Sequence, residues 1–407
     1  MPYTIGIDAR KIQDFGIGTY VRNLIGALAQ IDRDNRYVLF VRPQDRDIVR
    51  QLPDNFHTVV EKSGVYSARE MVALSWRLFR LKLDLYHSTH YVLPAVVPCK
   101  VVVTIHDIIH LLYPEFLPSN FAFLYAQRMI RRSLTRGDQI ITVSQNTRSD
   151  LMQYFEVDGR KIQAIYNGVE DVFRTRVSAE EQERWLRDLG IERPYLLFVG
   201  NPKPHKNLDT VVQAYARARN RAAFDAPLIC VGNRDATVFK IRQRAEYLGI
   251  GDKVRLLGHV AQEALPALYQ GATLFLYPTL YEGFGLPVVE AMASGVAVIT
   301  SNTSALKEVA EGYAHLVDPL DIDGMAKAIA HCMTDAEHRN SLAKLGTRRA
   351  DTFRWEQTAR QTLEVYLAAV EGRAPVLDVG GGGGGAGSGG DRQDRPRPER
   401  IAAGGRG

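Results

Sequence analysis

The chain alternates short, continuous apolar runs with longer helical patterns, and it does so in two successive sets. The first set predicts strands at residues 4–8, 37–41, 84–87, 101–106, 139–143 and 161–165. The second set predicts strands at residues 195–199, 228–231, 254–257, 274–276, 297–300 and 315–317. Apolar strands separated by helices indicate parallel sheets that are covered on both faces. We therefore expect an α/β fold of two Rossmann-like, doubly wound domains that face each other across a cleft.

The domain boundaries follow from the same pattern. A chain of 407 residues is too long for one ordinary core, so we expect a first domain at residues 1–184 and a second at 185–354. A helical stretch at residues 355–372 follows the last strand and is a candidate to cross back to the first domain. Residues 380–407 are rich in glycine and cannot bury enough apolar surface to offset their ordering entropy, so we expect a disordered tail.

Charge and cysteine content limit the classes of partner and the cellular compartment that we expect for this chain. The formal charge of +5 is spread along the chain without a basic block, which argues against a nucleic-acid partner. Cys99, Cys230 and Cys332 are far apart and form neither a disulfide framework nor a metal-like pair, which favours a cytoplasmic location. The N-terminus lacks a signal-peptide pattern, and no apolar run reaches the ~20 residues that span a bilayer.

Membrane contact, if present, is therefore expected to be peripheral. The predicted helix at residues 120–136 combines aromatic residues with four arginines and is a candidate for contact with the inner membrane surface. The alternative is a helix with one core face and one solvated basic face.

The motif with the most specific spacing lies at residues 281–295, after a predicted strand and at the start of a helix. Glu282 and Glu290 bracket a Gly-Phe-Gly loop. The N–H groups of Phe284, Gly285 and Leu286 precede the helix, where an anion is favoured. We expect Glu290 in the first helical turn, able to accept hydrogen bonds from sugar or ribose hydroxyls. Two separate structural carboxylates would not account for this arrangement.

These residues resemble the retaining GT-B glycosyltransferases, a large family that includes bacterial mannosyltransferases and glycogen and sucrose synthases. The hallmark of that family is a pair of glutamates separated by seven residues, which Glu282 and Glu290 match. The likeness extends over nearly the whole chain to about Glu371 and includes residues 6–10, 105–107, 143–144, 167–169 and 199–200.

The resemblance implies roles for further residues. Lys206 corresponds to a family lysine that pairs with the donor diphosphate, and a fixed cation of this kind stabilises the leaving group where no metal does. Many relatives carry an arginine nearby, whereas this chain has Asn201 and His205, so Lys203 is the candidate second cation. His106, at the end of a strand, corresponds to a histidine that touches the transferred sugar; a hydrogen-bonded core histidine is the alternative.

The first domain offers Gly16 and Gly18 before a predicted helix at residues 19–30. Glycines there allow close approach to phosphate or sugar, and in related enzymes this loop closes over donor and acceptor. A plain turn explains the two glycines equally well from the sequence alone.

No metal site is predicted. The pairs Asp32/Asp34, Asp45/Asp47 and Asp321/Asp323 have the Asp-x-Asp spacing of metal sites in other glycosyltransferases. We expect the first pair in a turn, the second at the start of a surface helix and the third at a helix cap, with Asp323 as the capping residue.

We therefore predict a metal-independent retaining hexosyltransferase with no cofactor, in which the nucleotide sugar is a substrate. Mannosyl transfer from GDP-mannose to a hydroxyl of a glycan, lipid-linked sugar or polysaccharide precursor is the first expectation. Catalytic roles fall to Glu282, Lys206 and His106. Open alternatives are a UDP- or other nucleotide-hexose donor, a sugar phosphorylase or nucleotide-sugar epimerase, and a nucleotide-sugar-binding subunit without catalysis. Donor contacts fall to Glu290, Phe284, Gly285, Leu286, Gly16, Gly18 and Lys203.

Overall fold

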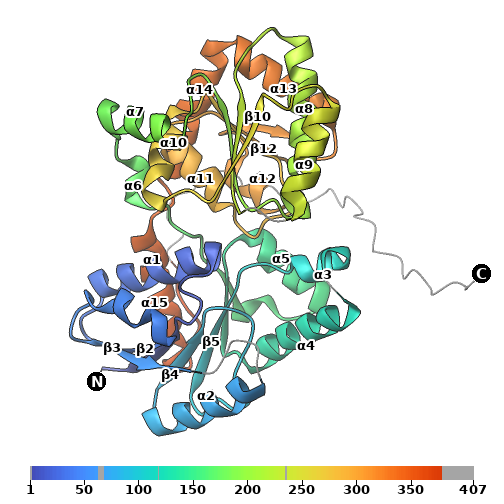
Figure 1. Cartoon of the computed structure of the whole chain (residues 1–407). Coiled ribbons are helices and arrows are strands. Elements are labelled where there is room, and N and C mark those ends of the chain that lie inside the picture. Colours follow the sequence, from blue (N-terminus) through green and yellow to red (C-terminus); the bar gives the residue numbers. More distant parts are fainter. Residues whose placement is uncertain (1, 63–67, 118, 234–235, 378–407) are drawn as a thin grey trace, which may run out of the picture. The chain divides into compact units, whose positions relative to one another are not determined.

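The computed structural model describes residues 2–62, 68–117, 119–233 and 236–377, which belong to one compact unit. Two parallel sheets with helices on both faces confirm the predicted pair of Rossmann-like domains (Figure 1). The predicted tail at residues 380–407 lies outside the described residues.

The first sheet is parallel throughout. Its described part has seven strands in the order β3-β2-β1-β4-β5-β6-β7. The sequence pattern missed β3, whose central residues are exposed at the edge of the sheet, so the strand lacks a continuous apolar run. The strands are β1 (Thr4–Asp8), β2 (Arg36–Val41), β3 (Phe56–Val60), β4 (Leu85–Ser88), β5 (Lys100–Ile105), β6 (Gln139–Thr142) and β7 (Ile162–Ala164).

Alternate residues of these strands pack into two separate cores. Along β2, Tyr37, Leu39 and Val41 pack with α1, whereas Val38 and Phe40 pack with α2, α4 and α5. This alternation follows from the two-residue period of a strand that is covered on both faces. The elements between these strands are α1 (Phe15–Ile31), η1 (Pro43–Val49), α2 (Ala68–Leu81), α3 (Ile109–Leu112), η2 (Pro114–Phe116), α4 (Asn120–Arg136), α5 (Gln145–Phe155) and η3 (Gly159–Lys161).

The second sheet repeats this design. Within the described residues it has six parallel strands in the order β10-β9-β8-β11-β12-β13. All six were expected from the sequence, because the four central strands have buried apolar runs and the edge strands β10 and β13 keep shorter ones. The strands are β8 (Leu196–Val199), β9 (Leu228–Val231), β10 (Val254–Gly258), β11 (Leu274–Tyr277), β12 (Val298–Ser301) and β13 (His315–Val317).

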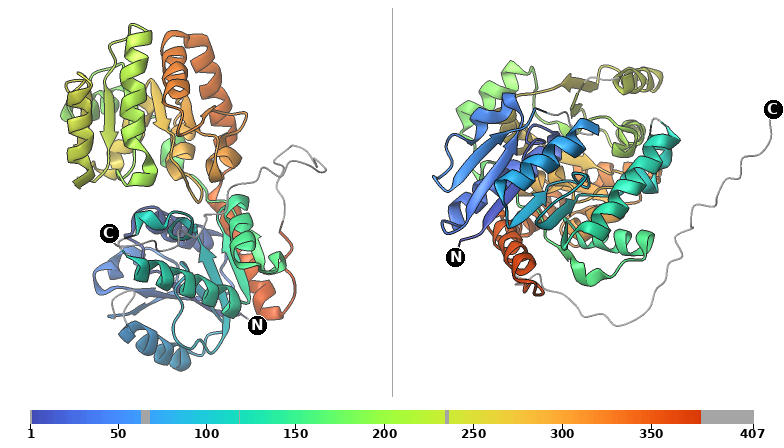
Figure 2. Two further views of the ribbon diagram at one scale, coloured as in Figure 1. Left: turned by 90° about the vertical axis from the view of Figure 1, so that its right-hand side faces the viewer. Right: turned by 90° about the horizontal axis from the view of Figure 1, so that it is seen from below.

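Helices also cover both faces of the second sheet (Figures 1 and 2). Helices α8, α9 and α13 pack together on one face, and α10, α11, α12 and α14 pack together on the other. These elements are η4 (Pro204–Lys206), α8 (Leu208–Arg221), α9 (Ala236–Tyr247), η5 (Gln262–Ala264), α10 (Leu265–Gly271), α11 (Leu286–Ala293), α12 (Ser304–Ala310), α13 (Ile322–Thr334) and α14 (Ala336–Ala350). Along the chain, the segment between the last strand of the first sheet and the first strand of the second contains α6 (Asp171–Arg174) and α7 (Ala179–Asp188).

The last described helix, α15 (Trp355–Glu371), packs against α1 and against strands of the first sheet, although it follows the second sheet in the sequence. The hydroxyl of Tyr366 lies 2.6 Å from Nδ1 of the buried His87, whose Nε2 lies 2.8 Å from the Thr104 hydroxyl. The hydroxyl of Thr358 donates to the carbonyl of Tyr166 at 2.7 Å. These contacts place α15 in the first domain. No helix among the described residues is both long and apolar enough to cross a bilayer.

In each sheet the strand order reverses at one point, between β1 and β4 and between β8 and β11. Loops diverge from the carboxyl ends of the strands at such a point, and open parallel sheets bind their ligands there. The fold thus directs attention to the loops that follow β1, β4, β8 and β11.

Candidate active site

Residues of both domains line a cavity of about 490 Å³. Its walls include residues that follow β1, β8 and β11 beside the two switch points, together with residues that follow β5, β6, β7, β9 and β10. A volume of this size suits a ligand of several hundred daltons. The predicted site residues that line it are Gly16, His106, Lys203, Lys206, Glu282, Phe284, Gly285, Leu286 and Glu290.

Lys206 and Glu282 form an ion pair in this cavity. Lys206 ends the short turn η4 after β8, and Glu282 lies in the loop after β11, the neighbouring strand in the sheet. The Lys206 ammonium donates to Oε1 of Glu282 at 2.6 Å and to the Tyr277 hydroxyl at 2.9 Å. The two charged side chains are only 18% and 13% exposed. The sequence-distant motifs therefore meet at one point, with a cation and a carboxylate side by side.

The surroundings keep Lys206 charged. Burial alone would lower the pKa of its ammonium group, but the Glu282 carboxylate and the Tyr277 hydroxyl outweigh that effect and raise the pKa above its usual value. Lys206 is thus a fixed cation at neutral pH, held in a partly desolvated position where its charge acts strongly on a bound anion.

Asn207 holds the backbone next to this lysine. Its φ of 61° lies in the left-handed region, where asparagine is better tolerated than most residues. Its side-chain amide donates to the carbonyls of Pro278 at 3.0 Å and Pro319 at 2.8 Å. These hydrogen bonds therefore hold the turn that carries Lys206 against the loop after β11 and the segment that follows β13.

Glu290 lies in the second turn of α11, not in the first as expected, because the helix begins at Leu286. Its Oε2 accepts a hydrogen bond of 3.0 Å from the hydroxyl of Tyr269. Burial raises the pKa of Glu290 to about 7, while the Tyr269 hydroxyl opposes this shift. A carboxyl group of this kind is poised to accept hydrogen bonds from hydroxyl groups and to change its charge near neutral pH.

The glycines between the two glutamates are required by the fold of the loop. A Cβ atom on Gly283 would lie 2.1 Å from the backbone oxygen of His106, so the loop after β11 and the end of β5 approach each other through bare backbone. Gly285 has a φ of 100° and precedes α11 as its N-cap residue. Both glycines thus fix how the loop enters the helix and how closely it approaches the first domain.

The three predicted donor contacts at residues 284–286 divide into two kinds. The Phe284 side chain is 4% exposed and packs edge-on against Phe353, with ring centroids 5.4 Å apart, so it belongs to the core. The backbone at Gly285 and Leu286 opens α11, and the first N–H groups of a helix have no acceptor within the helix. The backbone, rather than the aromatic ring, is what this segment presents to an anion.

His106 directly follows β5 and lines the cavity. Its Nε2 lies 2.9 Å from the carbonyl oxygen of Thr89, which requires that Nε2 carries the proton and donates. Burial lowers the pKa of His106, so the ring is neutral at pH 7. Its edge also packs against Tyr20, with ring centroids 4.9 Å apart. The ring is therefore held in one tautomer at the cavity wall.

Gly16 and Gly18 differ from the expectation. Helix α1 begins at Phe15, so both glycines lie in its first turn rather than in a loop before it. Gly16 is exposed and lines the cavity. Gly18 is buried outside the cavity wall, and a Cβ atom there would lie 2.5 Å from the backbone oxygen of Ile12. Gly18 is required where the chain enters α1, and the prediction that it contacts the donor stays a prediction.

Comparison with known proteins assigns the family. The family model "Glycosyl transferases group 1" matches residues 181–349, and the model "Glycosyltransferase Family 4" matches residues 16–173. O-antigen chain mannosyltransferase B of Escherichia coli is 31% identical over 295 residues, which cover 72% of this chain and 76% of that protein. The chain belongs to the group 1 glycosyl transferases.

Other similar proteins agree with this assignment. O-antigen chain mannosyltransferase RfbU of Salmonella typhimurium is 30% identical over 60% of this chain and 63% of that protein. Sucrose-phosphate synthase from Thermosynechococcus elongatus has the same fold, with a TM-score of 0.75 and 23% identity over 91% of this chain and 100% of that structure. Anabaena HepE in complex with UDP-glucose gives a TM-score of 0.73 at 18% identity, over 90% of this chain and 100% of that structure.

In this glycosyl transferase, the exposure of Lys203 and the burial of His205 decide which of the two can offer a positive charge to a phosphate. Lys203 is exposed and lines the cavity, so its charge is available to a phosphate. His205 lies beside it, but burial and the neighbouring Lys206 and Lys203 lower the pKa of His205 to about 3. His205 is thus uncharged at neutral pH and does not replace an arginine. Lys203 stays the candidate second cation.

The three Asp-x-Asp pairs of the glycosyl transferase lie outside the cavity wall. Asp32 accepts from the Tyr37 hydroxyl at 2.6 Å and ends α1, as expected for a helix-to-strand turn. Asp45 is buried and pairs with Arg42 at 2.9 Å. The residue that caps α13 is Asp321, not Asp323, since its side chain accepts from the N–H of Gly324 at 2.9 Å.

The sequence interpretation overlooked Tyr277, Tyr269 and the role of Asn207. Tyr277 is the last residue of β11, and its position at the carboxyl end of a strand beside the switch point was a usable signal. Tyr269 comes from α10 and reaches Glu290 only through tertiary packing, so no local pattern in the sequence pointed to it.

Proposed function

We propose that this glycosyl transferase moves a hexosyl group from a nucleotide-diphosphate sugar to an acceptor hydroxyl, with retention of configuration and without a metal ion. The observation that carries the proposal is the charged Lys206 beside Glu282, in a cavity that also contains Glu290. A fixed ammonium group can supply the charge stabilisation that a divalent cation supplies elsewhere.

In this proposal the second domain binds the nucleotide. Glu290 accepts hydrogen bonds from the ribose hydroxyls, and Lys206 binds the diphosphate together with the backbone that opens α11. Lys203 provides the second cation for the phosphates. The hexose then lies between Glu282 and His106, which come from different domains and line the same cavity. The acceptor enters over the first domain, next to Gly16.

The proposed step is a displacement on one face of the sugar. The acceptor oxygen forms a bond to the anomeric carbon as the bond from that carbon to the diphosphate oxygen breaks. The acceptor proton passes to the departing diphosphate, whose growing negative charge Lys206 stabilises. Glu282 positions the lysine through their 2.6 Å contact, and the neutral His106 offers its ring to a sugar hydroxyl. Closing the cavity over the donor would favour transfer over hydrolysis by excluding water.

Mannose from GDP-mannose is the proposed donor sugar. Several similar proteins are named mannosyltransferases, including those of Escherichia coli and Salmonella typhimurium. A UDP-hexose is the second candidate, because the structural neighbour HepE was solved with UDP-glucose. By analogy with the O-antigen enzymes, the proposed acceptor is a growing glycan, free or lipid-linked. No cofactor is proposed beyond the nucleotide-sugar substrate.

A donor panel tests the proposal without knowledge of the acceptor. Purified protein is given GDP-mannose, UDP-glucose, UDP-galactose or GDP alone, and thermal stabilisation and slow release of nucleoside diphosphate are measured. GDP-mannose should give the fastest release, and the first anomer released, followed by NMR, should match that of the donor. Inversion would contradict the proposed displacement, faster release from a UDP-sugar would reassign the donor, and no release from any sugar would favour a binding subunit.

Peripheral membrane contact through α4 is part of the proposal. Phe121, Leu124, Arg128 and Arg131 lie on one face of this helix, since their spacing of three, four and three residues follows the helical period. Phe121 and Leu124 are 78% and 58% exposed, which is unusual for neighbouring large apolar residues. Apolar insertion next to arginines is the combination that binds anionic bilayers.

Sedimentation with vesicles tests this contact. The wild type should sediment with vesicles that contain anionic lipid and much less with neutral ones. The double variant Phe121→Ser/Leu124→Ser should lose this binding. Phe239→Ser is the matched control, because Phe239 is 65% exposed on α9 of the second domain. Equal binding by the double variant and the control would rule out α4 as the contact.

A further inference from the structure

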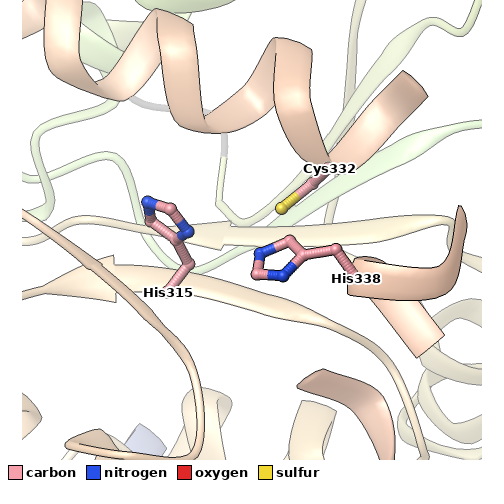
Figure 3. Close-up of side chains that lie close together, drawn as sticks. All are labelled: His315, Cys332 and His338. Atoms are coloured by element: carbon pink, nitrogen blue, oxygen red, sulfur yellow. The ribbon is translucent and has the colours of Figure 1, made fainter. Parts of the chain in front are cut away.

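Two histidines and a cysteine converge in the second domain, away from the candidate active site. His315 is the first residue of β13, Cys332 lies near the end of α13, and His338 lies in the first turn of α14. One ring nitrogen of each histidine and the Cys332 sulfur lie within 4.8 Å of one another. Figure 3 shows these three atoms facing the same small space.

The position of this cluster separates it from sugar transfer. His315 lies at the amino end of β13, whereas the cavity lies at the carboxyl ends of the strands. None of the three residues is part of the cavity wall. A role for the cluster must therefore be distinct from binding the nucleotide sugar.

Ordinary packing leaves part of the cluster unexplained. Nε2 of His338 is buried and has no hydrogen-bond partner among the described residues. Its ring lies 6.0 Å from that of His315 and 4.5 Å from that of His331, measured between centroids. Several imidazole rings side by side bring acceptor nitrogens together, and burying such a nitrogen without a donor costs free energy. A cation among them would remove that cost.

We propose that His315, Cys332 and His338 bind a zinc-class transition-metal ion. Two imidazole nitrogens and a thiolate match the preference of Zn²⁺ for nitrogen and sulfur ligands, whereas Mg²⁺ and Ca²⁺ prefer oxygen. Water takes the fourth position. Cys332 is a free cysteine, and its thiol carries a proton before binding. Binding forms a metal–sulfur bond and releases that proton to solvent.

The surrounding structure holds the ligands close to a suitable geometry. Asp335 ends α13 and also caps α14, where its side chain accepts from the N–H of His338 at 2.8 Å. This tight connection fixes Cys332 and His338 relative to each other. His315 is fixed separately, because it pairs with Ile299 in the sheet.

Tetrahedral zinc with bonds of ordinary length separates its ligand atoms by about 3.5 Å. The three atoms must therefore draw together by up to about 1.3 Å, which small rotations of the side chains can provide. The bound ion would tie the α13–α14 connection to the edge strand β13, which is a structural role.

Metal titration of the full-length protein tests this site. Protein stripped with a chelator is titrated with Zn²⁺ and with Co²⁺, and bound metal is measured after gel filtration. We expect one zinc per chain, a rise of several degrees in Tm at saturating zinc, and a tetrahedral Co²⁺ spectrum. The cobalt form should also show a thiolate-to-metal charge-transfer band, which reports the Cys332 ligand in the wild type itself.

Substitutions then identify the ligands. Cys332→Ser should abolish the charge-transfer band, and His338→Gln should lower zinc affinity by at least about tenfold, the size of effect seen when metal sites lose supporting groups. His57→Gln is the matched control, since His57 is an exposed histidine on β3 of the first domain and its loss should change nothing. A wild-type cobalt complex without the charge-transfer band, or equal zinc binding in Cys332→Ser and wild type, would overturn the proposal. Neither result bears on sugar transfer, which is measured separately.

Discussion

Replacing Lys206 by alanine removes the charge on which the proposed chemistry depends. The ammonium is a largely buried, charged group 2.6 Å from Glu282, so it is already oriented before the donor binds. A preorganised charge of this kind stabilises the leaving diphosphate more in the transition state than in the ground state. Its loss should cost ~3 kcal/mol of transition-state stabilisation, or on the order of a hundredfold in kcat.

The same substitution also affects stability. Glu282 is only 13% exposed and would lose its cation, while the Tyr277 hydroxyl remains nearby. Leaving a largely buried carboxylate without its partner costs about 1–3 kcal/mol. We therefore expect Lys206→Ala to fold with a Tm lower by a few degrees, and the assays must be run well below that Tm.

Two measurements distinguish the effects. Initial rates of nucleoside-diphosphate release give kcat, and calorimetry with the free nucleoside diphosphate gives its affinity. Lys206→Ala should depress kcat far more than nucleotide affinity. Lys203→Ala is the comparison variant: Lys203 is the proposed second cation of the same cavity but is exposed, so its loss should lower kcat less. Wild-type turnover by Lys206→Ala would refute the assignment, and a large loss in Lys203→Ala alone would move the phosphate site to that residue.

Three further predictions follow from the same geometry. Because the pKa of Glu290 is raised to about 7 and ribose hydroxyls donate to its carboxylate form, nucleotide affinity should rise about tenfold from pH 6 to pH 8. Calorimetry on Glu290→Gln, which cannot ionise, should show neither this pH dependence nor wild-type affinity, and an unchanged pH profile of affinity would contradict the ribose assignment. Gly283→Ala forces the loop away from the His106 backbone and should lower stability by about 1–3 kcal/mol and reduce turnover, whereas Gly26→Ala, where the added Cβ meets no atom within 4 Å, should be neutral or slightly stabilising in the same thermal melts. Transfer should survive excess EDTA in wild type and in Cys332→Ser alike; loss of activity in both, restored by Mg²⁺ or Mn²⁺, would show that the chemistry needs a metal.

The strands illustrate what a sequence pattern can and cannot predict. The four central strands of the second sheet, β8, β9, β11 and β12, were predicted because a strand buried on both faces is apolar along its length. The edge strands β10 and β13 were predicted because each keeps a short apolar run, at residues 256–257 and 316–317. Strand β3 was missed because an edge strand tolerates polar residues such as His57 and Thr58 at exposed positions. Pairing with β2 across the sheet, rather than its own composition, makes that segment a strand.

The candidate site shows the same division. Glu282, Glu290 and Lys206 were found because each belongs to a short motif beside a predicted strand. The ion pair between Lys206 and Glu282 could not be read from the chain, since 76 residues separate them. For Gly18, a glycine required by a turn looks, in sequence, like a glycine required by a ligand. The approach of a Cβ to the Ile12 backbone oxygen reveals the requirement of the turn, which the sequence could not show.

By itself, the sequence determined the fold class, the family resemblance and the residues that carry its hallmark motif, because these depend on local periodicity and on short spacings. Only the tertiary structure decided which neighbours such residues have. Lys206 donates to Tyr277 and Glu282, Glu290 accepts from Tyr269, and two histidines lie near Cys332. Charge state, burial and metal-binding geometry are properties of such neighbours. They arise from contacts between segments far apart in the chain, and no local pattern encodes them.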